Sequence, residues 1–120
     1  MAEASQQAVE FVEVDDSAAL EELFARSASR PVVLFKHSTT CPISAHAHRQ
    51  MSQLDRERVG EVALVVVQTA RTVSDEIARR TGVGHESPQA FVLRDGKAVW
   101  NASHFDITVE AVESAVTENK

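Results

Sequence analysis

The stretch PVVLFKHSTTCPIS, residues 31–44, carries the clearest structural signal in this chain. Its first five residues form a continuous apolar run, which predicts a central strand buried on both faces. Pro31 fits only the start of such a strand, because proline donates no hydrogen bond to a ladder. After the loop at 36–40, Pro42 fits a first helical turn, where its missing N–H costs nothing. We expect that helix to run from about Pro42 to Arg58.

The residues before this stretch predict one strand and one helix. Apolar and acidic residues alternate at 11–14, as in an edge strand. The Asp-Asp-Ser run at 15–17 offers N-cap oxygens for a helix over 18–28. Residues 1–9 are mostly polar, so we expect them to form a flexible N-terminal tail.

The residues after the stretch 31–44 are predicted to form alternating strands and helices. A second aliphatic run at 61–67 predicts another buried strand. Ser74 is expected to cap a short helix that ends at Arg80 and is stopped by Gly82. Residues Gln68 to Arg71 end the second buried strand, and a position at the border of the pocket stays open for them without our assigning them to the site.

The last third of the chain predicts a hairpin and a helix. Strands at 90–93 and 98–100 are joined by Asp95-Gly96, a strong signal for a tight turn. Asp106 or Thr108 is expected to cap a final helix. The apolar stripe of that helix consists of Val109, Val112 and Val116.

The predicted element order is β-α-β-α-β-α-β-β-α. Helices that alternate with buried strands indicate parallel pairs, and the hairpin adds an antiparallel edge. We therefore predict a single domain over residues 1–120 of the α/β class. It is a three-layer fold with a central mixed sheet of four to five strands flanked by helices, in the order of thioredoxin-like folds.

The amino-acid composition argues against several classes of function. Twelve basic and eighteen acidic residues give a formal charge of −6, which argues against nucleic acid or an anionic membrane as partner. A single cysteine excludes a disulfide framework and fits a reducing compartment. No secretion signal is recognisable, and no apolar run approaches the ~20 residues of a membrane span. We expect a cytoplasmic protein.

Cys41 lies where the buried strand, the loop and the helix start meet. Free N–H groups and the positive end of the dipole at a helix N-terminus stabilise an anion such as a thiolate. A lone cysteine more often packs as a small buried hydrophobe. The Cys-Pro junction favours the reactive alternative, because it exposes the sulfur to solvent and to the dipole. We therefore predict that Cys41 is a catalytic nucleophile.

The residues 41–44, Cys-Pro-Ile-Ser, have the frame of a C-x-x-C motif with serine in the last position. In dithiol enzymes the second cysteine resolves the mixed disulfide formed by the first. Ser44 cannot do so, although its hydroxyl could donate a hydrogen bond to the thiolate. An outside thiol is therefore needed to finish each cycle. Lys36, five residues before the cysteine, is expected to add positive potential or to hold an anionic substrate group.

Three separated motifs resemble those of the monothiol bacilliredoxins of the bacillithiol system, which are thioredoxin-like proteins. They are FKHSTTCPIS at 35–44, GVGHESPQAF at 82–91 and WNASHFDIT at 100–108. The resemblance implies that Cys41 attacks mixed disulfides between proteins and bacillithiol, frees the protein thiol and keeps bacillithiol until a second thiol releases it. The implied partners are S-bacillithiolated proteins, with bacillithiol as the small thiol co-substrate and no bound cofactor.

The resemblance also implies the surroundings of the sulfur. The residues expected to support the thiol are Lys36, His37, Thr40, Pro42 and Ser44. Those expected to bind substrate are His85, Ser87, Pro88, Ser103 and His104. Ser87-Pro88 is implied to be the cis-proline peptide that lies beside the cysteine in thioredoxin-like folds. For His85 and His104, a loop histidine satisfied by local backbone stays open as the alternative.

Because bacillithiol carries a malate group and a glucosamine, anion recognition is expected. Lys36 and the N-terminus of the last helix are the candidates. His46 and His48 do not indicate a metal site, since helical positions i and i+2 point apart, and we predict no metal.

Two other functions stay open. One is an iron–sulfur carrier of the monothiol glutaredoxin kind, which has Gly-Phe after the cysteine where this chain has Pro42-Ile43. The other is a non-catalytic thioredoxin-like adaptor. A visible spectrum after anaerobic purification identifies the first, and the alkylation rate of Cys41 tests the second.

Overall fold

The computed structural model describes residues 8–120, and residues 1–7 lie outside the described part of the chain. Helices and strands follow the predicted order with two short additions, the helix α3 and the 3-10 helix η2. The elements are β1 (Glu10–Glu13), α1 (Ser17–Arg26), β2 (Val32–His37), α2 (Pro42–Met51), α3 (Arg56–Val59), β3 (Glu61–Val66), α4 (Arg71–Thr81), β4 (Gln89–Arg94), β5 (Lys97–Ser103), η2 (His104–Asp106) and α5 (Val109–Glu118).

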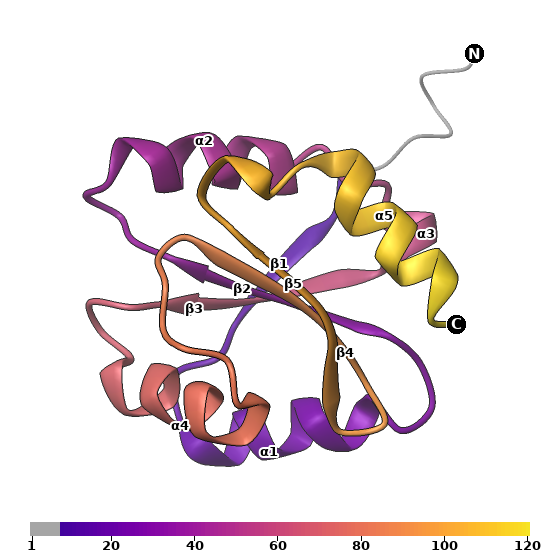
Figure 1. The fold of residues 1–120 in the computed structure, drawn as a ribbon, viewed down its shortest axis with the longest axis horizontal. Coiled ribbons are helices and arrows are strands. Elements are labelled where there is room, and N and C mark those ends of the chain that lie inside the picture. The colour runs from indigo at the N-terminus through magenta and orange to yellow at the C-terminus, as the bar shows by residue number, and fades with distance from the viewer. Residues whose placement is uncertain (1–7) are drawn as a thin grey trace.

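The strands form one mixed sheet in the order β1-β3-β2-β4-β5 (Figure 1). β1 and β2 both pair with β3 in parallel, whereas β4 pairs antiparallel with β2 and with β5. β2 is therefore the central strand, and five of its six residues are buried, as its apolar run predicts. The predicted α/β class with a mixed sheet is confirmed, with five strands.

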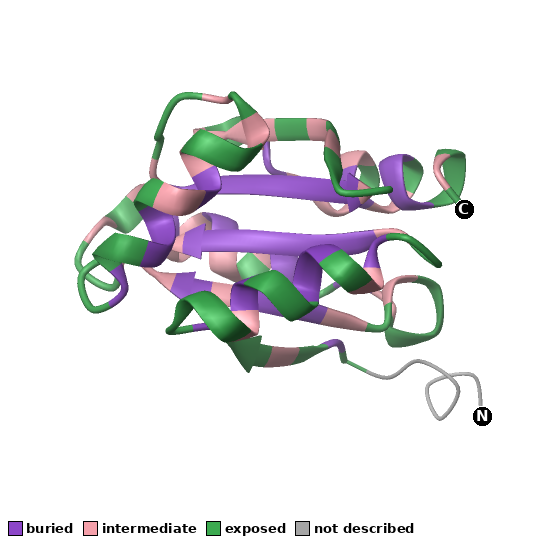
Figure 2. Ribbon diagram, turned by 90° about the horizontal axis from the view of Figure 1, so that it is seen from below, coloured by how far each residue is buried: buried purple, intermediate pink, exposed green. Residues whose placement is uncertain are grey.

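Helices cover both faces of this sheet and complete three layers. α2, α3 and α5 lie on one face, and α1 and α4 lie on the other (Figure 1). Successive side chains of a strand point to opposite faces. Phe35 therefore joins the core beneath α2 and α5, whereas Leu34 joins the core beneath α1 and α4. Figure 2 shows the buried central strands between helices whose outer faces are exposed.

Three predicted turns and caps are confirmed. Asp95 and Gly96 both have positive φ, 56° and 76°, in the turn between β4 and β5. A two-residue turn of this kind matches the twist of the flanking strands. Gly82 ends α4 in the left-handed region, with a φ of 74°. Of the two candidate caps for α5, Thr108 takes the position, and its side chain accepts a hydrogen bond from the N–H of Ala111.

The prediction of one helix from Pro42 to Arg58 is wrong. α2 ends at Met51, and a separate turn of helix, α3, begins at Arg56. The side chain of Asp55 accepts a hydrogen bond from the N–H of Glu57 and so caps α3. An aspartate that bonds to nearby backbone in this way competes with a continuous helix.

The prediction that Ser74 caps α4 is also wrong. The helix begins at Arg71, and Ala70 occupies the N-cap without a side-chain hydrogen bond. Ser74 lies inside the helix and is buried, with its Oγ 3.2 Å from Nδ1 of His85. The hydroxyl of Ser74 thus contacts a residue of another segment, His85, and does not cap its own helix.

Two residues of the predicted N-terminal tail belong to the folded part. Ala8 forms an antiparallel bridge with Asp55, and Val9 is buried in the core beneath α2 and α5. The apolar side chain of Val9 is the physical reason, and the tail prediction is wrong for these two positions. Its remaining part, 1–7, lies outside the described residues. No helix among residues 8–120 combines the length and apolar character needed to span a membrane.

Candidate active site

Cys41 occupies the N-cap position of α2 with an extended backbone, φ −103° and ψ 123°. Pro42 is the first helical residue, as predicted, and the carbonyl of Cys41 accepts the first hydrogen bond of the helix, from the N–H of Ala45 at 3.0 Å. The cysteine is half-buried. A cysteine in this place presents its sulfur next to the free N–H groups of a helix start, where negative charge is stabilised.

The buried hydroxyl of Ser44 fixes the loop that carries Cys41. It accepts a hydrogen bond from the N–H of Ser38 at 2.9 Å and lies 2.7 Å from Nδ1 of His37. Burial and then the neighbouring His48 lower the pKa of His37, which favours its neutral ring. Which of the two groups donates depends on the tautomer of the ring. No hydrogen bond joins Ser44 to the sulfur of Cys41 among the described residues, and the hydroxyl instead bonds to His37 and to the loop backbone.

Gln68 ties the same loop to the residues after β3. Its Nε2 donates to the hydroxyls of Ser38, at 2.8 Å, and Thr40, at 3.2 Å. Its Oε1 accepts from the N–H of Thr39 at 3.3 Å. Thr40 thus supports the thiol loop indirectly, through an amide on a neighbouring segment.

His37 lies behind the loop rather than in front of the sulfur. Its ring packs against those of Phe35 and His48, with centroids 5.5 Å and 4.9 Å away. His48 in turn stacks on Phe11 at 4.7 Å. This aromatic cluster gives His37 a structural role beneath Cys41. No group of three or more His, Cys, Asp or Glu side chains within residues 8–120 is placed to hold a metal ion.

A cavity of about 530 Å³ opens beside the sulfur. It lies where the parallel strands β2 and β3 both end, at one edge of the sheet (Figure 1). Its lining residues are Ser38, Cys41, Val67, Gln68, Arg71, Ser74, Asp75, His85 and Ser87. Of the residues predicted to bind substrate, His85 and Ser87 line this cavity.

Ser87 presents an unsatisfied group to this cavity. Its Oγ is buried and has no hydrogen-bond partner within the described residues. Buried hydroxyls are normally hydrogen-bonded, so one without a partner in the wall of a cavity calls for an explanation. The Ser87–Pro88 peptide bond is cis, as the resemblance implies. The carbonyl of Pro88 accepts a hydrogen bond from the N–H of His104 at 3.1 Å.

Lys36 lies behind the cavity. Its side chain is 0% exposed, and its Nζ lies 2.7 Å from Nδ1 of His85 and donates to Oε1 of Gln89 at 3.2 Å. Burial lowers the pKa of Lys36 to about 8, against the opposing effect of the Asp75 and Glu86 carboxylates. The expectation that Lys36 holds a substrate anion directly is wrong, because its ammonium is enclosed and already bonded to protein groups.

His85 connects this buried lysine to the cavity. An ammonium group can only donate, so Nδ1 of His85 is the acceptor and the ring proton is assigned to Nε2. Burial lowers the pKa of His85, and the positive charge of Lys36 lowers it further. Ser74 Oγ, 3.2 Å from the same Nδ1, helps to hold the ring. His85 therefore lines the cavity as a neutral imidazole with one orientation and one tautomer.

Ser103 and His104 do not line the cavity. Ser103 is paired with Gln89 at the end of β5, and Nε2 of His104 lies 3.9 Å from a carboxylate oxygen of Glu86. The N-terminus of α5, the other candidate for anion recognition, is also absent from the lining. Two of its N–H groups already donate, one to Thr108 and one to Oε1 of Gln50.

The residues after β3 form one wall of the cavity beside Cys41. Gln68 and Arg71, whose place at the pocket border was left open, line it together with Asp75, which the sequence did not indicate. The N–H of Val67 donates to the carbonyl of His37 at 3.0 Å, which brings the ends of β3 and β2 together. The predicted parallel pairing of these strands was the available signal, since parallel strands end at the same edge of a sheet.

The chain matches known proteins over most of its length. The sequence profile of the family described as "Monothiol bacilliredoxin BrxC" matches residues 12–112. A solved structure provisionally assigned as an oxidoreductase with a thioredoxin fold is 38% identical, with a TM-score of 0.81, and the match covers 88% of this chain and 92% of that chain.

Thioredoxins share the fold at lower identity. The thioredoxin of Fasciola hepatica is 20% identical with a TM-score of 0.70, and the match covers 90% of this chain and 98% of that one. A mutant thioredoxin from Halobacterium salinarum is 14% identical with a TM-score of 0.73, covering 92% and 90%. With its single cysteine at the start of a helix, the chain belongs to the monothiol bacilliredoxin family and is a thiol–disulfide oxidoreductase of the thioredoxin fold.

Proposed function

We propose that the protein removes bacillithiol from protein mixed disulfides through Cys41. The Cys41 thiolate attacks the bacillithiol sulfur, a new disulfide forms between Cys41 and bacillithiol, and the substrate protein leaves as a thiolate. A second thiolate then attacks the sulfur of bacillithiol, which restores the Cys41 thiolate and gives a soluble disulfide. Each step exchanges one disulfide for another, and over the whole cycle the second thiol is the external reductant, which is oxidised to a disulfide while the substrate cysteine is reduced.

The observation that carries this proposal is the placement of one cysteine with no resolving partner. Cys41 opens to a cavity of about 530 Å³ at a helix start, and the fourth residue of its motif is a serine. That serine is buried and bonded to His37 and to the loop backbone. The motif therefore supports a stable adduct on Cys41 that only an outside thiol can release.

The cavity offers polar groups suited to the small thiol. Arg71 carries the only positive charge among the lining residues and forms no ion pair within residues 8–120, and we propose that it binds the carboxylates of the malate group. Ser87 has a free hydroxyl for a hydrogen bond to the sugar or the amide. Asp75 supplies a carboxylate that can accept from the glucosamine amine.

We further propose that Lys36 acts on the substrate through His85. By donating to Nδ1, the ammonium of Lys36 keeps the proton of His85 on Nε2. That N–H is then available to a substrate acceptor in the cavity. Lys36 is thus a positioning residue, while His85 is the group that contacts the substrate. Consistent with this reaction, we propose a cytoplasmic location and S-bacillithiolated proteins as partners.

Mass spectrometry of the intact protein tests the proposal. The reduced protein is mixed with a bacillithiolated substrate protein, and both masses are followed with time. We expect the mass of one bacillithiol to move to Cys41 while the substrate loses it, and added free bacillithiol to remove the adduct. The Cys41→Ser variant should take up no mass. Failure of the wild-type protein to acquire the adduct, with the thiol shown to be free, would refute the proposal.

A further inference from the structure

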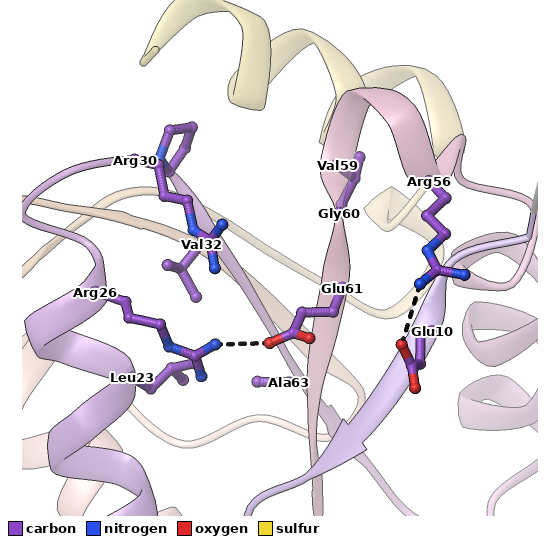
Figure 3. Close-up of a pocket in the computed structure, with 11 residues that line it drawn as sticks. Glu10, Leu23, Arg26, Arg30, Val32, Arg56, Val59, Gly60, Glu61 and Ala63 are labelled. Atoms are coloured by element: carbon purple, nitrogen blue, oxygen red, sulfur yellow. Dashed lines mark hydrogen bonds and ion pairs between the residues drawn. The ribbon is translucent and has the colours of Figure 1, made fainter.

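A second cavity, of about 180 Å³, lies at the opposite end of β2 from Cys41. It sits where β2 and β3 begin, between the end of α1 and the start of α3 (Figure 3). The walls include Val32 and Ala63 from the strands and Leu23 from α1. The site proposed above contributes none of its residues to this lining, so this cavity needs a separate explanation.

Three arginines from separate elements surround the cavity. Arg26 ends α1, Arg30 lies in the loop before β2, and Arg56 begins α3. Arg26 pairs with Glu61 at 2.7 Å, and Arg56 lies 3.5 Å from Glu10 (Figure 3). The two carboxylates on β3 and β1 thereby orient two of the guanidinium groups toward the same hollow.

The third arginine has no such partner. Arg30 is exposed, its side chain makes no hydrogen bond or ion pair within residues 8–120, and its guanidinium carries five N–H donors that are open to a ligand. Nε of Arg26 is buried and also lacks an acceptor. A buried donor without an acceptor is costly, and a charged donor more so. The wall of the cavity therefore contains one buried donor that the described protein groups leave unsatisfied, beside an arginine that none of them pairs.

The net charge of the lining residues also favours an anion as the ligand. The three arginines face two glutamates, so the lining carries one excess positive charge in a chain whose formal charge is −6. Arg30 also borders a neighbouring hollow that Arg58, Lys120 and Glu57 line, where Arg58 is paired with Glu113. Cations gathered around open donors attract an anion, and guanidinium groups bind oxyanions through paired N–H groups.

From these contacts we infer that this cavity binds a small tetrahedral oxyanion of the phosphate class, with the guanidinium groups of Arg30 and Arg26 as its principal donors. A tetrahedral ion has oxygens in several directions, which suits donors that approach from separate elements. A planar carboxylate can face only one of these groups with both oxygens. The cavity is large enough for one such group and too small for an extended ligand.

The test is a titration of the ¹⁵N-labelled protein with inorganic phosphate, at ionic strength held constant with sodium chloride. Amide shifts of residues 26–32 and 56–63 are expected to change and to saturate. The Arg30→Gln variant should bind phosphate about tenfold more weakly, because a hydrogen bond to a charged group is lost. Arg79→Gln is the matched control, since Arg79 is exposed on α4 and loses the same charge away from the cavity. It should bind within twofold of the wild type.

Further titrations separate the proposal from simpler explanations. Sulfate should move the same amides, and acetate should bind much more weakly. Comparison with glycerol 3-phosphate identifies the source of the group, because tighter binding of the ester indicates a phosphorylated metabolite and tighter binding of phosphate indicates the free ion. Shifts that do not saturate, that are equal in the two arginine variants, or that acetate reproduces at equal concentration overturn the proposal.

Discussion

The two ends of β2 differ in the polar groups that surround them. At the carboxyl end, the residues that hold the Cys41 loop are hydroxyls, an amide and a neutral histidine, and the one nearby ammonium is buried behind the cavity. At the amino end, guanidinium groups stand at the surface and pair with glutamates. A reactive thiolate placed beside bare cations would be held in an ion pair. The comparison suggests that dipoles hold the loop that carries the sulfur, while the fixed charges at this end, Arg71 and Asp75, stand across the cavity lining rather than in the loop.

The largest expected effect is loss of the sulfur itself. In Cys41→Ala, transfer of bacillithiol should fall to the rate without protein, because no other thiol exists in the chain. The free energy of unfolding should change little, since Cys41 is half-buried and makes no side-chain cap. Transfer is measured by intact mass and stability by urea denaturation. Residual turnover above background would show that the carboxyl end of β2 does not supply the nucleophile.

A smaller loss is expected when the buried ammonium is removed. Lys36→Met keeps the approximate length of the side chain but removes the charged donor from Nδ1 of His85 and from Oε1 of Gln89. Ser74 Oγ remains 3.2 Å from that Nδ1, and the N–H of Glu86 still donates to that Oε1. We expect the transfer rate to fall about tenfold, the equivalent of one hydrogen bond to a charged group.

A spectroscopic readout separates positioning from simple damage to the fold. The ¹⁵N shifts of the His85 ring should move from a fixed Nε2–H tautomer in the wild type to a mixture in Lys36→Met. As the control, Lys97→Met removes an exposed lysine on β5 and should leave both rate and ring shifts unchanged. An unchanged His85 ring in Lys36→Met would contradict the role assigned to the lysine.

The same lysine makes a prediction about alkaline stability. Its pKa is lowered from 10.5 in the unfolded chain to about 8 in the folded protein. Between these values the unfolded state binds more protons than the folded state, so the free energy of unfolding rises with pH. We expect that rise in the wild type from about pH 8 upward, and its loss in Lys36→Met.

The chain suits this measurement because it contains no tyrosine, whose ionisation would overlap with that of lysine. Urea denaturation followed by the fluorescence of Trp100, the single tryptophan, gives the free energy at each pH. Equal pH dependence in the wild type and in Lys36→Met would mean that the ammonium is hydrated in solution.

Lys36 also shows which features of the fold and the site could be predicted from the sequence. The apolar run before it predicted a buried strand, and the Cys-Pro step predicted the helix start, because both signals are local. A lysine at the end of a buried strand can extend into solvent or stay inside. Its direction is set by Gln89 and His85, about fifty residues away, and no local pattern contains that pairing.

Similar reasoning explains the other differences. Ser44 was expected to face the sulfur because of its spacing from Cys41, yet its hydroxyl bonds to a histidine on β2. Arg71 and Asp75 line the cavity because β3 pairs in parallel with β2, so that the residues after β3 lie beside the loop after β2. Motif spacing therefore located the nucleophile, whereas the walls around it depend on tertiary pairing that spacing does not encode.

A moderate effect is expected from Ser44→Ala. The change leaves the N–H of Ser38 without an acceptor and removes the partner of Nδ1 of His37. Stranding a buried polar group costs about 1–3 kcal/mol, so unfolding should become easier by that amount. Ser52→Ala is the matched control, because Ser52 follows the same helix and bonds only to the carbonyl of Arg49. It should cost less than about 0.5 kcal/mol. If both variants lost the same free energy of unfolding, Ser44 would not be the residue that holds the loop in place.

The smallest expected effect lies at the amino end of β2. Arg26 and Glu61 approach within 2.7 Å, but their side chains are 37% and 36% exposed, so water screens the attraction. A double-mutant cycle with Arg26→Gln and Glu61→Gln should give a coupling energy of about 0.2–1 kcal/mol. The coupling should shrink further between 0.05 and 1 M sodium chloride, over which the Debye length falls to about 3 Å. A coupling well above this range, insensitive to salt, would mean that the pair behaves as a buried one, and the contrast between the two ends of the strand would disappear.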